Sequence, residues 1–378
     1  MKASTSDYTP GDLASWEKVD PADAGFDASR LESVADYHRA NESAWPNSMY
    51  MPNGEYVGTA YIEEKPPYNT VIGPVKERGG PAGMILRGGR IVSHWGDIER
   101  PDMTFSVAKS FLGVLAGLAV DRGLIRSLDD RVAEYALDDG FEGPHNSAIT
   151  WRHLLQQTSE WEGTLWDKPD SVDRNRQAGP GAVNTAKGDD RELSAPGTHW
   201  EYNDVRVNRL SLSLLQAFRE PLDEVLEKSI MTPIGATNWV WHGYDNSKVV
   251  IDGREMTSVT GGSHWGGGFQ IPTDALARFG LLVSRKGAWN GQQLIPANWI
   301  DQMLEPCHAN PVYGFMWWLN TDRKLHPSAP ATSFFALGAG SNVIWIDPEL
   351  DIVMVARWVA KDKVDGLVAT VCEAMIRD

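Results

Sequence analysis

The segment Thr104–Ile125, TFSVAKSFLGVLAGLAVDRGLI, is the most informative stretch of this 378-residue sequence. It is almost entirely apolar as far as Gly123, which is typical of a helix that is buried on all sides. Within it, Lys109 is the only Lys or Arg between Arg100 and Arg122. A buried lysine costs free energy unless its amine has a partner or a task. We therefore expect Lys109 to have a function, the alternative being an ammonium that reaches solvent from the helix start.

Ser106 and Lys109 form an S-x-x-K pair in the first turn of this predicted helix. Residues at that spacing share a helix face, so the amine can reach the hydroxyl. The positive helix end and its free backbone N–H groups stabilise an alkoxide or an oxyanion. Burial and the same positive end favour a neutral lysine amine, which can act as the base for a serine nucleophile. A second such pair, Ser15–Lys18, lies in the polar N-terminal segment and lacks this context.

A second candidate segment is Pro196–Asp204, PGTHWEYND. Its Tyr202 comes just before a helix that we expect from Asp204 to about Glu220. A tyrosine near a lysine can be held as the phenolate or can relay a proton to a leaving group. The alternative is a tyrosine that packs at a domain boundary with its hydroxyl bonded to the backbone.

Strand patterns occur early and late in the chain, with helix patterns between them. The sequence predicts a helix over Asp27–Asn41, a hairpin over Gly83–Trp95, strands over Ser341–Ile346 and Asp351–Val359, and a C-terminal helix from Val364. The middle is mainly helical, with a long loop over Trp161–Trp200. This order suggests an α/β part built from both termini and a helical part inserted between them.

The composition excludes several classes of protein. Asp+Glu (51) exceeds Lys+Arg (35), and the net charge of −16 disfavours nucleic acid, an anionic membrane and, more weakly, an anionic substrate. With two cysteines and scattered histidines, we expect no disulfide scaffold, no metal and no cofactor. The sequence shows neither a signal-peptide core nor a membrane-spanning run, which predicts a cytoplasmic protein.

The order of these motifs resembles that of the serine β-lactamase and penicillin-binding protein superfamily. The S-x-x-K pair is followed about 90 residues later by PGxxxxY-x-D, then by a Gly-rich segment and a C-terminal strand pair. From about Phe26 onward, the chain looks most like the class C-related branch of esterases, DD-peptidases and 6-aminohexanoate-dimer hydrolases. The resemblance implies an α+β, β-lactamase-like fold, with an antiparallel sheet flanked by helices and an inserted, mostly helical domain. The implied division is an irregular lead-in at 1–25, a sheet domain at 26–105 and 261–378, and the inserted domain at 106–260, with the active site between the two domains.

The resemblance also implies roles for the motif residues. Ser106 would be the acylated nucleophile, Lys109 its proton acceptor, and Tyr202 a second general base and acid. The third residue of the family's Tyr motif is commonly Asn, whereas this chain has Asp204. A carboxylate facing Lys109 would favour the ammonium form and shift the role of base towards Tyr202. Alternatively, Asp204 turns away and caps the following helix.

The family's third element is a Lys-Thr-Gly or His-Thr-Gly triplet on the strand beside the site. Ala336-Leu337-Gly338 aligns with it, and Gly338 permits close backbone approach. The N–H groups of Ala339 and Ser106 would then form the oxyanion hole. Because Ala336 replaces the cation that helps lactam-binding members hold a carboxylate, a neutral ester or amide fits better than a β-lactam.

Four further residues are candidates for a substrate-binding wall. The Gly-rich segment Gly261–Gly268 contains His264 and Trp265, and the long loop contains Trp166 and Asp173, which could cover the site. The alternatives are a core histidine bonded to the backbone and a loop cap at Asp173.

These motifs predict a serine hydrolase that acts through an acyl-enzyme on small carboxylic esters. The alternatives are an amidase or peptidase resembling the 6-aminohexanoate-dimer hydrolases, a β-lactamase, and a catalytically silent binding module, which Asp204 makes conceivable. The expected partner is a small-molecule ester or amide, and the sequence does not indicate an oligomeric state.

Overall fold

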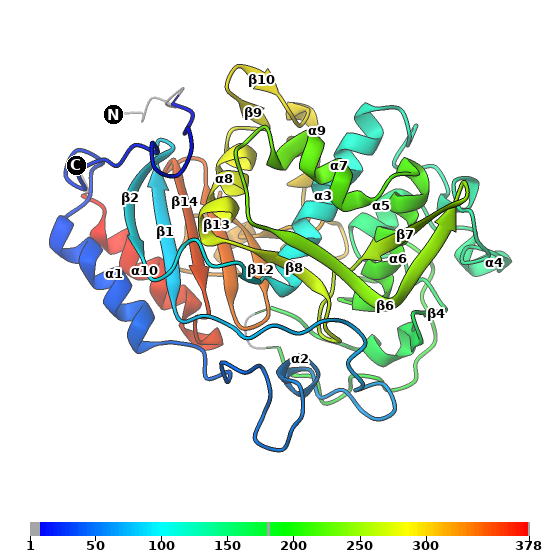
Figure 1. Cartoon of the computed structure of the whole chain (residues 1–378). Helices are drawn as coiled ribbons and strands as arrows, with labels where there is room; N and C mark the ends of the chain where they lie inside the picture. Colours follow the sequence, from blue (N-terminus) through cyan, green and yellow to red (C-terminus); the bar gives the residue numbers. More distant parts are fainter. Residues whose placement is uncertain (1–7, 180–181, 377–378) are drawn as a thin grey trace.

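The fold is α+β and β-lactamase-like, with antiparallel sheets and flanking helices, in a computed structural model that describes residues 8–179 and 182–376 (Figure 1). Its main sheet has six strands in the order β11-β12-β13-β14-β1-β2, and each neighbouring pair is antiparallel. The strands are β1 (Ala82–Arg87), β2 (Arg90–Trp95), β11 (Trp318–Leu319), β12 (Phe334–Gly338), β13 (Asn342–Asp347) and β14 (Ile352–Arg357). The sheet thus joins an early hairpin to the last third of the chain.

Helices cover both faces of this sheet (Figure 1). Helices α1 (Ala28–Ala40) and α10 (Val364–Ala374) pack on one face, and α8 (Thr273–Ser284) packs on the other. Strand residues alternate between the faces, so in β13 Trp345 joins the apolar cluster of α1 and α10, whereas Ile344 joins the cluster of α8. Because both faces are covered, β13 and β14 are buried along their whole length.

Several local predictions are confirmed. The Asp27 side chain accepts a hydrogen bond from the Arg30 amide and caps α1, as its position before the helix predicts. The β1–β2 hairpin turns at Gly88 and Gly89, both of which have positive φ, the conformation that favours glycine in a tight hairpin. The two late strands and the C-terminal helix also form where the sequence predicts them.

The middle of the chain contains more strand than the sequence suggests. A second sheet has the order β3-β8-β6-β7, formed by β3 (Asp102–Met103), β6 (Val240–Ile251), β7 (Arg254–Val259) and β8 (Gly268–Ile271). Two short hairpins are β4 (Thr164–Leu165) with β5 (Lys168–Pro169) and β9 (Ala288–Trp289) with β10 (Gln292–Gln293). The remaining helices are α2 (Val57–Tyr61), α3 (Ala108–Asp121), α4 (Gly143–Asn146), α5 (Trp151–Leu155), α6 (Asp204–Phe218), α7 (Leu222–Leu226) and α9 (Ala297–Met303). The proposed domain boundaries stay a prediction.

Helix α3 is the buried helix that the apolar segment predicts, and it packs against α6. Its start differs in detail, because Ser106 lies in a short 3-10 turn, η1 (Phe105–Val107), directly before α3. Among the described residues, no helix combines the length and the apolar character that a membrane crossing requires.

Candidate active site

A pocket of about 310 Å³ lies beside η1 and brings together residues from distant parts of the chain. Four of the predicted site residues line it, namely Ser106, Tyr202, Gly338 and Ala339. They come from η1, from the segment before α6, and from the end of β12. The S-x-x-K motif, the Tyr motif and the aligned triplet therefore meet at one cavity.

The turn that carries Ser106 has an unusual backbone. Phe105, the preceding residue, has φ of 51°, which is uncommon for a bulky side chain. Its side chain is buried and packs edge-to-face against Trp45, with ring centroids 5.3 Å apart. Such a conformation persists only where the surrounding structure holds it. Packing of Phe105 thus helps to fix Ser106 at the pocket.

Gly338 lets β12 approach this turn closely. A Cβ atom at this position would lie 1.9 Å from the Thr104 carbonyl oxygen and 3.3 Å from the Ser106 backbone nitrogen. No other residue type fits without displacing the two segments. The following residue, Ala339, lines the same pocket as Ser106, and the oxyanion hole of their two N–H groups stays a prediction.

Lys109 is enclosed and uses its amine locally. Its side chain is only 2% exposed, so it does not reach solvent from the helix start. The Nζ atom donates to Ser106 Oγ at 2.8 Å and to the Gly261 carbonyl at 3.0 Å, and it lies 2.6 Å from Asp204 Oδ1. The first two contacts are hydrogen bonds, and the third is a close ion pair with the Asp204 carboxylate. Lys109 is therefore held in hydrogen-bond contact with the candidate nucleophile.

Asp204 faces Lys109 rather than capping α6. The cap is Asn203, whose Oδ1 accepts from the Arg206 amide at 3.2 Å. The second oxygen of Asp204, Oδ2, lies 2.9 Å from Arg176 Nη1 and 2.7 Å from His264 Nδ1. Burial alone would raise the pKa of Asp204, but Arg176, Lys109 and the hydrogen bond with His264 together hold this pKa well below its usual value. Asp204 is therefore a carboxylate that contacts Lys109 through one oxygen and Arg176 and His264 through the other.

The contacts of Asp204 extend into a larger buried cluster, which we call the Lys109 network. Arg176 Nη1 lies 3.2 Å from Asp173 Oδ2, and Lys187 Nζ lies 3.5 Å from Asp173 Oδ1. Lys187 also lies 3.1 Å from Glu64 Oε2, which in turn is 3.5 Å from His264 Nε2. The network consists of Glu64, Lys109, Asp173, Arg176, Lys187, Asp204 and His264.

Part of this network has the spacing of a metal site. Potential ligand atoms of Glu64, Asp173 and His264 lie within 4.8 Å of one another. However, Lys187 lies between the two carboxylates, and Arg176 also binds Asp173. Burial raises the pKa of Asp173, but Arg176 and Lys187 outweigh it and leave this pKa below its usual value. Protein cations thus already balance the charge that a metal ion would neutralise.

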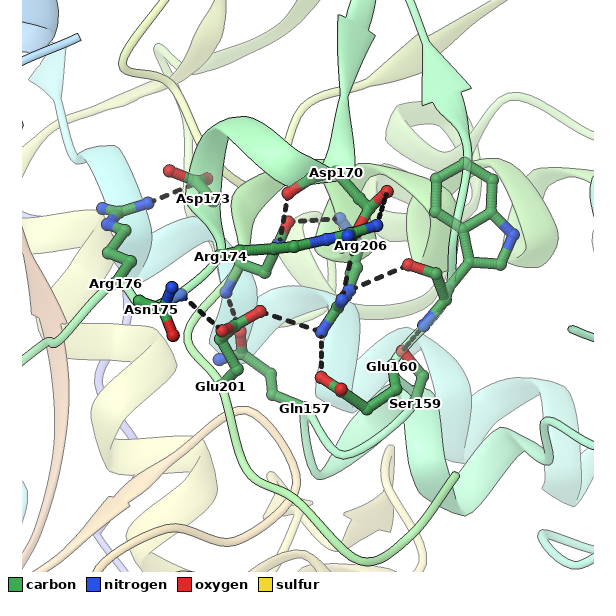
Figure 2. Close-up of polar contacts among 12 residues, drawn as sticks. Gln157, Ser159, Glu160, Asp170, Asp173, Arg174, Asn175, Arg176, Glu201 and Arg206 are labelled. Carbon is green, nitrogen blue, oxygen red and sulfur yellow. Dashed lines mark hydrogen bonds and ion pairs between the residues drawn. The ribbon is translucent and has the colours of Figure 1, made fainter. Parts of the chain in front are cut away.

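A second buried charge cluster supports the loop that leads to Arg176 (Figure 2). Arg206 of α6 lies 2.6 Å from Glu160 Oε1, 3.0 Å from Glu201 Oε2 and 3.1 Å from Asp170 Oδ2. We call this group the Arg206 cluster; it consists of Glu160, Asp170, Arg174, Arg191, Glu201 and Arg206. Because Arg206 follows Tyr202 closely in the chain, the cluster ties the long loop to the element that carries the Tyr motif.

Tyr202 is held by aromatic neighbours. Its ring stacks on Trp318, with centroids 5.6 Å apart and an interplanar angle of 28°, and it meets Tyr313 edge-to-face. Two cations lie near the same ring, with Lys109 Nζ 4.7 Å and Arg176 Cζ 5.3 Å from its centroid. Tyr202 therefore lines the same pocket as Ser106, with its ring fixed between aromatic and cationic neighbours.

Residues 70–363 match the family model described as Beta-lactamase, which covers more than half of the chain. The chain belongs to the beta-lactamase family. It is a member of the superfamily of serine hydrolases that share the β-lactamase fold.

Individual beta-lactamase-family relatives are distant. An uncharacterized protein of Alkalihalophilus pseudofirmus is 24% identical over 273 residues, which are 66% of this chain and 71% of that protein. The solved structure of a putative 6-aminohexanoate-dimer hydrolase from Bacillus anthracis has a TM-score of 0.55 and 16% identity, and covers 97% of each chain. The solved structure of EstCE1, a hydrolase with promiscuous acyltransferase activity, has a TM-score of 0.56 and 17% identity, and covers 93% of this chain and 98% of that one. At these identities, the structural likeness establishes the fold alone.

Of the six residues predicted to contact substrate in this beta-lactamase-family chain, only Gly338 lines the pocket. Asp204, the second of them, is bound to Lys109, Arg176 and His264 instead. His264 is 3% exposed and bonded to Asp204, and the Trp265 indole donates to the Tyr68 carbonyl at 2.8 Å. Asp173 is buried in the Lys109 network, and Trp166 packs at the edge of the main core. These positions do not support direct contact with a substrate in the pocket, because none of the four residues belongs to its lining.

Other pocket residues were not found from the sequence. They include Tyr61, Arg176, Trp318, His326 and Lys361. Burial lowers the pKa of His326 to about 4, so its imidazole is neutral at pH 7. These residues come from loops, from the ends of short helical turns and from a short edge strand, where no periodic pattern signals that they converge.

Proposed function

We propose that this chain is a serine hydrolase that cleaves small carboxylic esters through an acyl-enzyme on Ser106. The observation that carries the proposal is the hydrogen bond of 2.8 Å between Lys109 Nζ and Ser106 Oγ, at the wall of a pocket that Tyr202 also lines. A serine hydroxyl is a weak nucleophile until a neighbouring base takes its proton. Here both candidate bases lie beside it.

In the first step, Ser106 Oγ attacks the ester carbonyl and its proton passes to the pair formed by Lys109 and Tyr202. The reactive form of this pair carries one proton fewer than ammonium plus phenol. If the missing proton is that of Lys109, the amine takes the proton of Ser106 directly; if it is that of Tyr202, the phenolate takes it. The carbonyl oxygen becomes negative and binds the N–H groups of Ser106 and Ala339.

In the second step, the tetrahedral intermediate collapses and the alcohol leaves with the proton that the pair holds. A water molecule then takes the place of the alcohol, and the two steps run in reverse. Its proton goes to the same pair, its oxygen attacks the acyl carbon, and Ser106 leaves with the proton. In total, one ester and one water molecule give one carboxylic acid and one alcohol, and the enzyme returns to its starting state.

The pocket supports an apolar acyl or alcohol group. Its wall includes the apolar side chains of Ile62, Trp318, Leu337, Val343 and Val364. At the position of the family triplet, Ala336 provides no cation, which favours neutral esters over β-lactams. We further propose that the protein acts in the cytoplasm, as the sequence predicts.

A second candidate function is hydrolysis of a small linear amide. Its support is the likeness along 97% of the chain to a putative 6-aminohexanoate-dimer hydrolase. The same acyl-enzyme chemistry would serve, but the leaving amine must be protonated as it departs, which gives Tyr202 a larger share of the work.

The test compares p-nitrophenyl butyrate, butyryl p-nitroanilide and a chromogenic cephalosporin as substrates. We expect the wild-type protein to hydrolyse the ester fastest, and Ser106→Ala to hydrolyse none of the three. Ser110→Ala is the matched control, because Ser110 is a buried serine of α3 whose hydroxyl donates to the Met316 carbonyl instead. Comparable rates on the anilide would favour the amidase, and fast cephalosporin turnover would favour a β-lactamase. No turnover in the wild type would indicate a silent binding module.

A further inference from the structure

We propose that Arg176 is a positioning residue whose positive charge offsets that of the Asp204 carboxylate. Lys109 can then release its proton and accept the proton of Ser106. This inference rests on the proposed function, because it concerns the proton acceptor of Ser106. Arg176 belongs to the long loop after η3 (Asp170–Asp173), and no sequence motif marks it.

The starting point is the chemical problem that Asp204 creates. A carboxylate 2.6 Å from the Lys109 amine attracts the proton-bearing form of that amine, and burial strengthens the attraction because water does not screen it. An amide at this position, as the family commonly has, would not hold the ammonium in this way. Unless its charge is shared, Asp204 would keep the candidate base protonated.

The geometry divides that charge between the two oxygens. Asp204 Oδ1 faces Lys109, whereas Oδ2 faces Arg176 at 2.9 Å and His264 at 2.7 Å. Arg176 is itself fixed, because the same Nη1 atom lies 3.2 Å from Asp173 Oδ2. Its side chain is 9% exposed, so the guanidinium acts with little screening by solvent. The positive charge of Arg176 therefore opposes the hold of Asp204 on the Lys109 proton.

The positive charge of Arg176 also acts on Tyr202, where it favours loss of the phenol proton. Its Cζ lies 5.3 Å from the Tyr202 ring centroid, and it lines the pocket with Tyr202. A cation on this side stabilises negative charge on the phenol as it loses a proton. Arg176 thus supplies a buried positive charge at a site where Ala336 leaves the aligned triplet without one.

The charged groups around Lys109, Asp204 and Arg176 determine how the activity should depend on pH. Among the described residues, the other charged or titratable groups that face Lys109, Asp204 and Arg176 are Glu64, Asp173, Lys187, Tyr202, Tyr244, His264 and Tyr313. Removal of Arg176 leaves two carboxylates, Asp173 and Asp204, with one cation fewer. The proton on Lys109 is then held more tightly, and a higher pH is needed to release it.

The experiment is a double-mutant cycle of Arg176→Gln and Asp204→Asn, with kcat/KM for p-nitrophenyl butyrate measured across pH. We expect Arg176→Gln to move the acidic limb of the profile up by about one pH unit and to reduce kcat/KM at pH 7 by about tenfold. In the Asp204→Asn background the same substitution should move the limb by less than half as much, because the carboxylate that Arg176 offsets is gone and only the direct effect of Arg176 on Tyr202 remains. Arg176→Lys, which keeps the charge but loses the fixed fork, should fall between wild type and Arg176→Gln.

A merely structural role would give a different pattern. If Arg176→Gln lowers kcat/KM equally in both backgrounds and leaves the limb unmoved, the proposal is wrong. If Arg176→Gln does not fold, Arg176→Lys carries the same test, since an unmoved limb in both backgrounds would again overturn the proposal.

A second readout separates this inference from the proposed function. NMR titration of protein with 13C-labelled lysine side chains, with the Lys109 13Cε signal assigned by its loss in Lys109→Arg, reports how the protonation of the Lys109 amine depends on pH without any turnover. We expect its midpoint to move to higher pH in Arg176→Gln and to stay within about 0.3 unit in the Asp204→Asn background. If the wild type hydrolyses no ester but the midpoint moves in this way, the proposed function fails and the role of Arg176 stands. An unmoved midpoint contradicts that role whatever the turnover.

Discussion

Gly338→Ala perturbs the contact between β12 and the turn that carries Ser106. The new Cβ would lie 1.9 Å from the Thr104 carbonyl oxygen, whereas Cβ atoms essentially never approach closer than 3.0 Å. The two segments must therefore separate by about 3.0 − 1.9 = 1.1 Å. A displacement of about 1 Å at a reacting centre costs about 100-fold in rate. We expect kcat for p-nitrophenyl butyrate to fall by about this factor, with an overpacking cost of about 1–3 kcal/mol in the free energy of unfolding.

The assay is steady-state hydrolysis with thermal unfolding measured on the same samples. Gly80→Ala is the matched control, because a Cβ at Gly80 meets no atom within 4 Å and the chemical change is identical. This control should keep wild-type kcat. If Gly338→Ala stays within about threefold of wild-type kcat while folded, the proposed geometry around Ser106 is refuted, since a 1 Å displacement at the reacting centre should cost far more.

Three further predictions concern Tyr202 and the Arg206 cluster. Tyr202→Phe keeps the stack on Trp318 but removes the hydroxyl, so ester turnover should fall about 10²–10³-fold with little change in calorimetric Tm; unchanged turnover would remove Tyr202 from the mechanism. Arg206→Met removes the most deeply buried cation of the cluster and leaves Arg174 and Arg191 with three carboxylates. Urea titration should therefore show a loss of about 3–5 kcal/mol in the free energy of unfolding, and a loss below about 1 kcal/mol would contradict a stabilising role of Arg206. Burial raises the pKa of Glu160, but Arg191 and Arg206 outweigh it and lower this pKa from 4.5 to about 2. The carboxylate therefore contributes stability above pH 4.5 that is lost as the pH falls towards about 2. Urea titrations over this range should show that the free energy of unfolding falls less in Glu160→Gln than in wild type. Equal losses would contradict the lowered pKa of Glu160.

Local patterns predicted much of the fold. The cap at Asp27, the two glycines of the β1–β2 turn and the continuous apolar runs of β13 and β14 depend on near neighbours in the chain, so they can be recognised from short stretches. The β6–β7 hairpin was missed because its strands mix polar and apolar residues and its register shifts between Gly243 and Lys248. Its pairing depends on the tertiary structure rather than on alternation along the strand.

The residues of the candidate site also fall into two groups: those that a sequence motif predicts and those that only the tertiary structure brings together. Ser106, Lys109 and Tyr202 were predicted because two motifs carry them, and the structure brings them together at the pocket. Arg176 and Lys187 were missed, since each lies in an irregular loop and gains its meaning only from carboxylates far away in the sequence. The sequence left open whether Asp204 contacts Lys109 or caps the helix.

The structure decides between these alternatives. Asn203 takes the role of cap, and Asp204 turns inward because Lys109, Arg176 and His264 converge on its two oxygens. His264 was expected at the pocket wall as a substrate contact, but it lies behind Asp204 and bonds to its carboxylate. A Gly-rich sequence around a histidine predicts neither of these contacts, because both depend on where α6 and the long loop lie.

The most direct test of the account is to map the adduct that a fluorophosphonate probe forms with the intact protein. Trypsin cleavage after Lys109 separates Ser106 from Ser110, so peptide mass spectrometry can assign the modified serine. We predict one adduct on Ser106 in the wild type and in Ser110→Ala, and none in Ser106→Ala. An adduct on another residue, or a wild-type protein that stays unmodified, would contradict the assignment of Ser106 as the nucleophile.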